Sequence, residues 1–242
     1  MLPAIKKPQL WLNCVILVMI KNMINLYVVL ISSLISIGAF ISGVYKLFRK
    51  KSPLYFQLLI CAVGCLALEQ LYIAAAIWCN IFNPNINLGM IGLFGCNFFL
   101  FSANYGQLDS IIDDGSNTNS SARKIAFAAP IILACAIAII IPLIFSHSAK
   151  VVLLFIAMLI PACPASYFNL KHLLMPMDDF EFLKGTRKCN LSALLFYAIS
   201  VIYIYGIVLA KPWLQGIAMV MMSVSMLLVS IFAIEGAKQW AI

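Results

Sequence analysis

Residues 53 to 78 read PLYFQLLICAVGCLALEQLYIAAAIW, and the only charged side chain in this stretch is Glu69. A helix that crosses a bilayer needs about 20 consecutive, mostly apolar residues, because every backbone amide must find its hydrogen-bond partner inside the segment. This stretch is long and apolar enough to cross. It therefore predicts a membrane helix, and it marks its single carboxyl group as a candidate functional residue.

Six further stretches resemble it in length and composition. The seven segments run approximately over residues 24 to 45, 53 to 78, 87 to 108, 125 to 146, 150 to 172, 190 to 210 and 214 to 236. The whole chain is 64% hydrophobic and 10% charged, with a mean hydropathy of +1.04, whereas roughly a quarter of the residues of a soluble domain are charged. We predict an all-α, polytopic integral membrane bundle of seven transmembrane helices, formed as one domain by residues 23 to 242.

The distribution of Lys and Arg predicts the orientation of this bundle. Outer loops contain only Lys150 and Lys211, while the other side collects eleven basic residues: Lys46, Arg49, Lys50, Lys51, Arg123, Lys124, Lys171, Lys184, Arg187, Lys188 and Lys238. Because cytoplasmic loops are enriched in Lys and Arg, we expect the N-terminus outside and the C-terminus inside, in a multi-pass protein of the plasma membrane. The net charge of +8 then reflects topology, and we expect no nucleic-acid partner.

Residues 1 to 22 form a short N-terminal extension that fits this topology poorly. The apolar run from Trp11 to Ile20 is too short to span and is flanked by Lys6, Lys7 and Lys21. Three interpretations remain open: an interfacial helix, a signal-like segment, or sequence upstream of a true start near Met23.

Polar residues inside two segments are the candidates for ligand binding. Glu69 shares a helix face with Tyr72 and with small residues that let a neighbouring helix approach closely. The third segment is the most polar, and Asn97, Asn104 and Gln107 fall on one side of its helical wheel. Since such a helix tolerates little lipid contact, we expect it in the centre of the bundle, with these side chains near a cavity.

Acidic residues recur at the predicted cytoplasmic side. They form a cluster of Asp109, Asp113, Asp114, Asp178, Asp179 and Glu181. Carboxylates of this kind can hold a divalent cation that bridges a diphosphate, but interleaved acidic and basic residues are also typical of solvated loops. The spacing expected of a diphosphate site is missing, so we predict no metal site, and no cofactor fingerprint occurs in the sequence.

Prolines interrupt two of the predicted helices. Pro130 and Pro142 fall in the fourth segment, and Pro161 and Pro164 fall in the fifth. Each removes one amide donor from the helix, which bends it and can open a cavity.

These features favour a binding or sensing module. In this hypothesis the bundle accepts a small apolar or amphipathic ligand, and its long inner loops engage a cytoplasmic protein partner. One alternative is a transporter of a small solute or ion, with Glu69 as a protonatable coupling group. A retinal protein is excluded, because residues 214 to 236 contain no lysine for a Schiff base.

A second alternative is an intramembrane enzyme that modifies a lipid or prenyl substrate. The Glu69-x-x-Tyr72 pair, together with Asp109 at the end of the third segment, resembles the integral-membrane terpene cyclases. That resemblance implies a seven-helix enzyme in which Glu69 acts as an acid on a polyprenyl epoxide. It covers a short stretch, and Leu68 stands where the family pattern has tryptophan.

Overall fold

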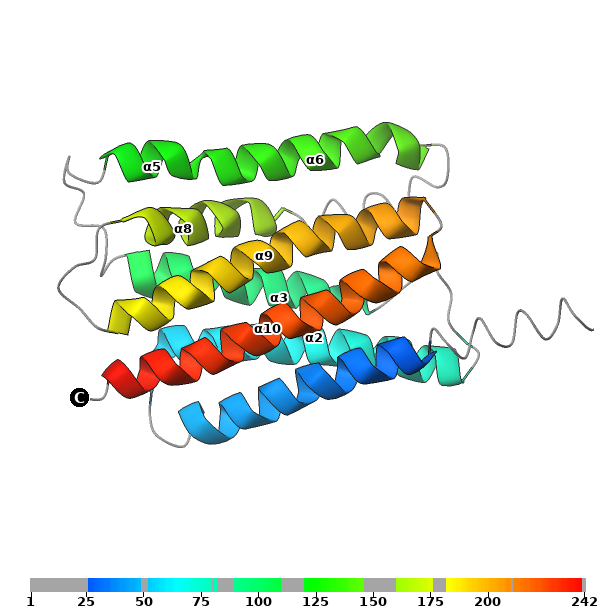
Figure 1. Ribbon diagram of the computed structural model, residues 1–242, viewed down its shortest axis with the longest axis horizontal. Helices are drawn as coiled ribbons and strands as arrows, with labels where there is room; N and C mark the ends of the chain where they lie inside the picture. Colours follow the sequence, from blue (N-terminus) through cyan, green and yellow to red (C-terminus); the bar gives the residue numbers. More distant parts are fainter. Residues whose placement is uncertain are drawn as a thin grey trace, which may run out of the picture.

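The computed structural model describes residues 26–48, 52–79, 81, 89–109, 120–145, 160–175, 182–209 and 211–240 (Figure 1). Within these ranges the chain is helical and contains no strand. A first helix covers Leu26–Phe48 and ends in the π-helical turn η1, Val44–Phe48. The elements that follow are α2 (Leu54–Trp78), α3 (Met90–Ala103), the π-helical turn η2 (Asn104–Leu108), α5 (Ser120–Ala126), α6 (Ala128–Phe145), α8 (Ala162–Leu174), α9 (Phe182–Val208) and α10 (Pro212–Trp240).

Five of these helical stretches are long and apolar enough to cross a membrane. They are Leu26–Phe48, Leu54–Trp78, Ser120–Ile139, Lys184–Val208 and Pro212–Gln239. The all-helical class predicted from composition is therefore confirmed, and the five candidate spans agree with a multi-pass membrane protein. The described helices of the third and fifth segments are shorter, with 14 residues in α3 and 13 in α8. The count of seven spans and their orientation stay predictions.

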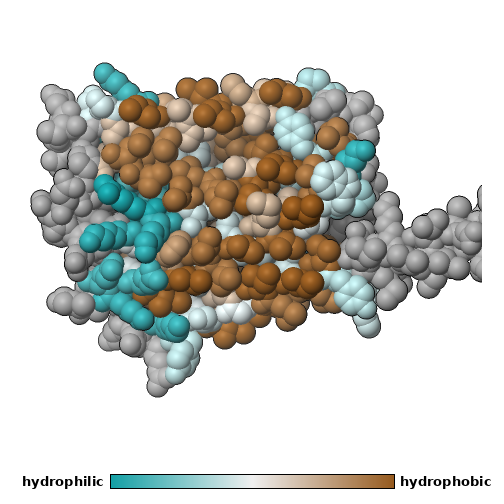
Figure 2. Space-filling view, in the orientation of Figure 1, coloured by the Kyte–Doolittle hydropathy of each residue, from teal (hydrophilic) through white to brown (hydrophobic). Residues whose placement is uncertain are grey.

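The helices lie side by side and alternate in direction along the chain (Figure 1). The most extensive packing joins α9 to α10 and α2 to α3, while α8 contacts α3, α5, α6 and α9. On the face shown in Figure 2, the surface between the two ends of the bundle is mostly apolar, and hydrophilic side chains gather at one end. We call this the charged end. Every described Lys and Arg except Lys211 belongs to it: Lys46, Arg123, Lys124, Lys171, Lys184, Arg187, Lys188 and Lys238.

The last two helices extend further toward the charged end than hydropathy predicts. The sequence FLKGTRK, expected to be part of a loop, forms the first turns of α9. A Cβ atom added at Gly185 would lie 2.7 Å from the Cα of Gly236 in α10. This close backbone contact extends the packing of α9 against α10 beyond the apolar residues of the two helices. Because the added residues are polar, hydropathy does not indicate that they are helical.

The fourth segment is interrupted next to Pro130, as the sequence predicts. Since proline has no N–H, Pro130 cannot donate to the carbonyl of Ala126, and α5 ends at that residue. The next helix, α6, begins at Ala128 and continues through Pro142. In the fifth segment, Pro161 occupies the N-cap of α8, where a missing amide donor costs little.

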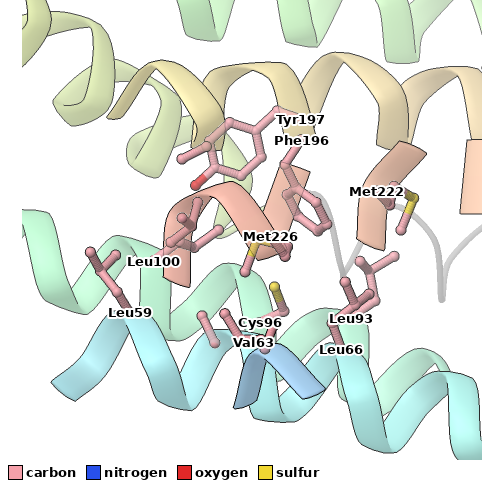
Figure 3. Close-up of a cluster of buried hydrophobic side chains, with 14 of the residues drawn as sticks. Leu59, Val63, Leu66, Leu93, Cys96, Leu100, Phe196, Tyr197, Met222 and Met226 are labelled. Atoms are coloured by element: carbon pink, nitrogen blue, oxygen red, sulfur yellow. The ribbon is translucent and has the colours of Figure 1, made fainter. Parts of the chain in front are cut away.

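The core lies between α2, α3, α9 and α10. Its side chains include Leu59, Val63, Leu66, Leu93, Cys96, Leu100, Phe196, Tyr197, Met222 and Met226, all of which are buried (Figure 3). Because lipid tails are as apolar as these side chains, close packing and hydrogen bonds between helices hold such a bundle together. Gln70 of α2 supplies one such link: it accepts from Ser36 Oγ at 2.9 Å and donates to Ser223 Oγ of α10 at 2.7 Å.

Candidate functional site

Glu69 lies inside the bundle, where α2 and α3 approach most closely. Its side chain is 3% exposed. A Cβ atom added at Gly92 of α3 would lie 2.6 Å from the carbonyl oxygen of Cys65 and 2.7 Å from the Cβ of Glu69. A glycine at position 92 is therefore what allows the α3 backbone to pack directly over the glutamate.

A second residue of α3 and one residue of α9 complete the surroundings of this carboxyl group. Cys96 of α3 and Tyr203 of α9 are both buried and lie close enough to Glu69 to interact electrostatically. The Oε2 atom of Glu69 is buried without a hydrogen-bond partner. A carboxyl oxygen in this position is costly to ionise, and it is available to a proton or to a donor group of a ligand.

The other predicted ligand-binding residues differ in how deeply they are buried. Asn97 and Asn104 are buried, with exposed fractions of 1% and 0%. Tyr72 is 36% exposed, so it lies on the outer side of α2 and not beside the buried carboxyl group. Gln107 belongs to η2, and its side chain lies outside the described residues.

Asn104 is the centre of a buried amide network that joins three helices. Its Nδ2 donates to the backbone carbonyl of Leu100 at 3.0 Å and to Asn169 Oδ1 of α8 at 3.2 Å. Asn169 Nδ2 in turn donates to the carbonyl of Ala165 at 2.7 Å and meets the Tyr197 hydroxyl of α9 at 3.4 Å. The two backbone carbonyls accept only, so they fix the orientation of both amides.

A charged cluster of Asp109, Lys171 and His172 lies next to this network. Asp109 follows η2, and its Oδ1 lies 2.5 Å from Lys171 Nζ and 3.0 Å from His172 Nε2. The other ring nitrogen of His172, Nδ1, lies 3.1 Å from Asn104 Oδ1. The side chain of His172 is fully buried, while Asp109 is 24% exposed and keeps partial contact with solvent.

The direction of the hydrogen bonds fixes the protonation of His172. Because the amide group of Asn104 donates to Leu100, its Oδ1 is left to accept, and Nδ1 of His172 must carry a proton. Nε2 faces a carboxylate oxygen and must also donate. These distances fit an imidazolium ion that bridges an amide and a carboxylate.

These contacts also set the charge of Asp109. Burial raises its pKa, but hydrogen bonds from His172 and Lys171 and their positive charge outweigh burial and hold the pKa below the usual 3.8. Asp109 is therefore ionised at neutral pH, and it anchors the end of η2 to α8.

The sequence analysis identified only part of this site. It selected Asn104 and Asp109, but it treated Lys171 as a topology determinant and did not select His172 or Asn169. The spacing of Asn169 and His172, three residues apart in the polar sequence NLKH, places both on one face of α8 and could have drawn attention to them. The remaining acidic candidates lie outside the described residues: Asp113, Asp114, Asp178, Asp179 and Glu181.

The described part of the chain holds no group of three or more His, Cys, Asp or Glu side chains that could bind a metal ion. It does contain buried polar residues at several levels: Glu69 of α2 under Gly92 of α3, Asn97 of α3, and Asn104 of η2 next to the charged cluster. Comparison with protein-family models, with curated proteins and with solved structures finds no match for this chain.

Proposed function

We propose that this chain is a seven-span protein of the plasma membrane, with its N-terminus outside, that binds a small amphipathic ligand and signals to a cytoplasmic protein partner. The alternating helix directions and the concentration of basic residues at one end support this topology. The third and fifth segments then cross the bilayer as α3 with η2, and as α8 with the residues before it.

One observation supports the sensing function most: the continuous stretch formed by α3 and η2 connects the buried carboxyl group to the charged end. Helix α3 packs over Glu69 through Gly92, and η2 then leads to Asp109, which pairs with Lys171 and His172 of α8. The link between them is a π-helical turn, a local distortion that frequently occurs at functional sites. A shift of α3 caused by binding at Glu69 would therefore move groups at the cytoplasmic side, where a partner protein can respond.

The unpartnered Oε2 atom of Glu69 favours proton-coupled transport as a second candidate function. A carboxyl group that takes up a proton on one side and releases it on the other needs this combination of burial and open hydrogen-bonding capacity. The enzyme alternative receives no comparable support, because it needs Glu69 and Tyr72 to act together and only Glu69 is buried.

The substitution Glu69→Gln separates the two candidates, with Glu235→Gln as the matched control. Glu235 is exposed at the charged end and pairs with Lys188 at 3.4 Å. A sensing module predicts that mass spectrometry finds an amphiphile co-purified with the wild type and the control but depleted from Glu69→Gln. It also predicts no proton flux in proteoliposomes.

A transporter predicts proton flux that is present in the wild type and the control and absent from Glu69→Gln. If Glu69→Gln matches the wild type in both assays, the proposed role of this residue is wrong.

A further inference from the structure

Five aromatic side chains form a connected surface across three helices at the charged end. Phe127, between α5 and α6, lies 4.7 Å from Tyr167 of α8 by ring centroids, and Tyr167 lies 5.1 Å from Phe168. Phe168 then meets Tyr105 of η2 at 5.4 Å and Phe101 of α3 at 6.0 Å. Phe127 and Tyr105 are 56% and 59% exposed. We call these five residues the aromatic surface.

This surface continues as a stripe toward the middle of the bundle. Phe94, Phe98, Phe101 and Tyr105 follow one another at spacings of four, three and four residues, so they share one face of the helix. The rings of Phe94 and Phe98 stack with centroids 6.5 Å apart and are 42% and 49% exposed. A ligand that lies in the membrane can follow this stripe, whereas a cytoplasmic peptide cannot.

Positive charge lies over the same surface. Arg123 and Lys124 are in the last turn of α5, one helical turn before Phe127. Lys171 Nζ lies 5.5 Å from the centroid of the Phe168 ring while it pairs with Asp109. In the part of the chain that the structure describes, these helical turns carry the basic residues Arg123, Lys124 and Lys171 and the acidic residue Asp109.

We propose that the aromatic surface binds an anionic phospholipid of the inner leaflet. In this site the phosphate group of the lipid lies near Arg123 and Lys124, and one of its acyl chains lies along Phe98 and Phe94. The proposal rests on the proposed function only in that it places this end of the bundle at the inner leaflet; the lipid site is separate from the Glu69 site. Basic residues near a membrane surface attract anionic lipids, and aromatic rings favour the headgroup region.

The test uses the full chain in nanodiscs that contain phosphatidylcholine and phosphatidylglycerol in a ratio of three to one. Native mass spectrometry measures the phosphatidylglycerol that stays bound after mild delipidation. The double variant Arg123→Gln/Lys124→Gln is compared with Lys184→Gln/Lys238→Gln, which removes the same charge from the same end on α9 and α10. We expect a loss of roughly tenfold or more in retained phosphatidylglycerol for the first variant only.

Two further measurements test whether the site binds the whole lipid and not only a phosphate group. Phe98→Ser should lower retention of phosphatidylglycerol, while Ile41→Ser, at another exposed apolar site on the first helix, should leave it unchanged. Added inorganic phosphate should not displace the lipid. Three results would each overturn the proposal. The two double variants could lose the same amount of phosphatidylglycerol, the wild type could retain phosphatidylcholine as well as it retains phosphatidylglycerol, or inorganic phosphate could displace the bound lipid.

Glu69→Gln is measured in the same nanodiscs. Glu69 lies in the core, away from the aromatic surface. The effect of Glu69→Gln on the co-purified amphiphile or on proton flux therefore tests the proposed function, whereas phosphatidylglycerol retention in the Arg123 and Lys124 variant tests the lipid site alone.

Discussion

Nε2 of His172 lies 3.0 Å from Oδ1 of Asp109, although the two residues are 63 positions apart in the sequence. The contact joins the end of η2 to α8, and Lys171 reinforces it from the same turn of α8. The carboxylate of Asp109 thus contacts two basic side chains that are themselves almost fully buried. This cluster is expected to control both the stability of the charged end and its response to pH.

Replacement of Asp109 by Asn should destabilise the protein. The substitution removes the carboxylate that pairs with the buried Lys171 and His172 side chains, which should lower the free energy of unfolding by about 3 kcal/mol, toward the low end for buried pairs because Asp109 is partly exposed. Glu235→Gln breaks an exposed pair and should cost less than about 1 kcal/mol. Unfolding of both variants in detergent micelles measures the difference. Equal effects would show that the cluster is not stabilising.

The stability contributed by Asp109 should be lost in acid. Its pKa is lower in the folded protein than the ordinary value of 3.8, so the unfolded chain binds the proton more readily. The contribution is therefore fully present above pH 3.8 and disappears as the pH falls through the folded-state pKa. Unfolding curves from pH 7 to pH 2 should show this loss in the wild type but not in Asp109→Asn. An identical profile for both proteins would contradict this assignment.

Position 92 should tolerate no side chain. The Cβ atom of Gly92→Ala would meet backbone atoms of Cys65 and Glu69 at 2.6 and 3.0 Å, so the helices α2 and α3 must separate. We expect a loss of about 1–3 kcal/mol in stability. Gly38→Ala is the control, because nothing lies within 4 Å of its added Cβ atom. Since alanine favours a helix, the control should be neutral or slightly stabilising. Thermal unfolding in detergent compares the two, and equal stability would argue against the close packing.

The helical class and most helix positions could be predicted from the sequence because membrane length and apolar composition leave few other structures. The buried position of Glu69 followed from the same argument, since an exposed carboxyl group in lipid is costly. The partners of Asp109 could not be predicted. Periodicity shows which residues share a face of one helix, but the meeting of Asn104, Asp109 and His172 depends on which helices are neighbours and on their relative height. Hydropathy likewise gave no sign that α9 begins at Phe182.

The most direct test of the membrane architecture asks on which side residues 79 and 120 lie. Cys79 follows α2 and Ser120 begins α5, so α3 and η2 alone separate them among the described helices. Two variants are prepared, one that keeps Cys79 as its only cysteine and one with Ser120→Cys as its only cysteine. Both are treated in intact cells with a membrane-impermeant maleimide. The seven-span account predicts that Cys79 is labelled from outside and that the cysteine at position 120 reacts only after the membrane is permeabilised. Labelling of both from the same side would contradict it.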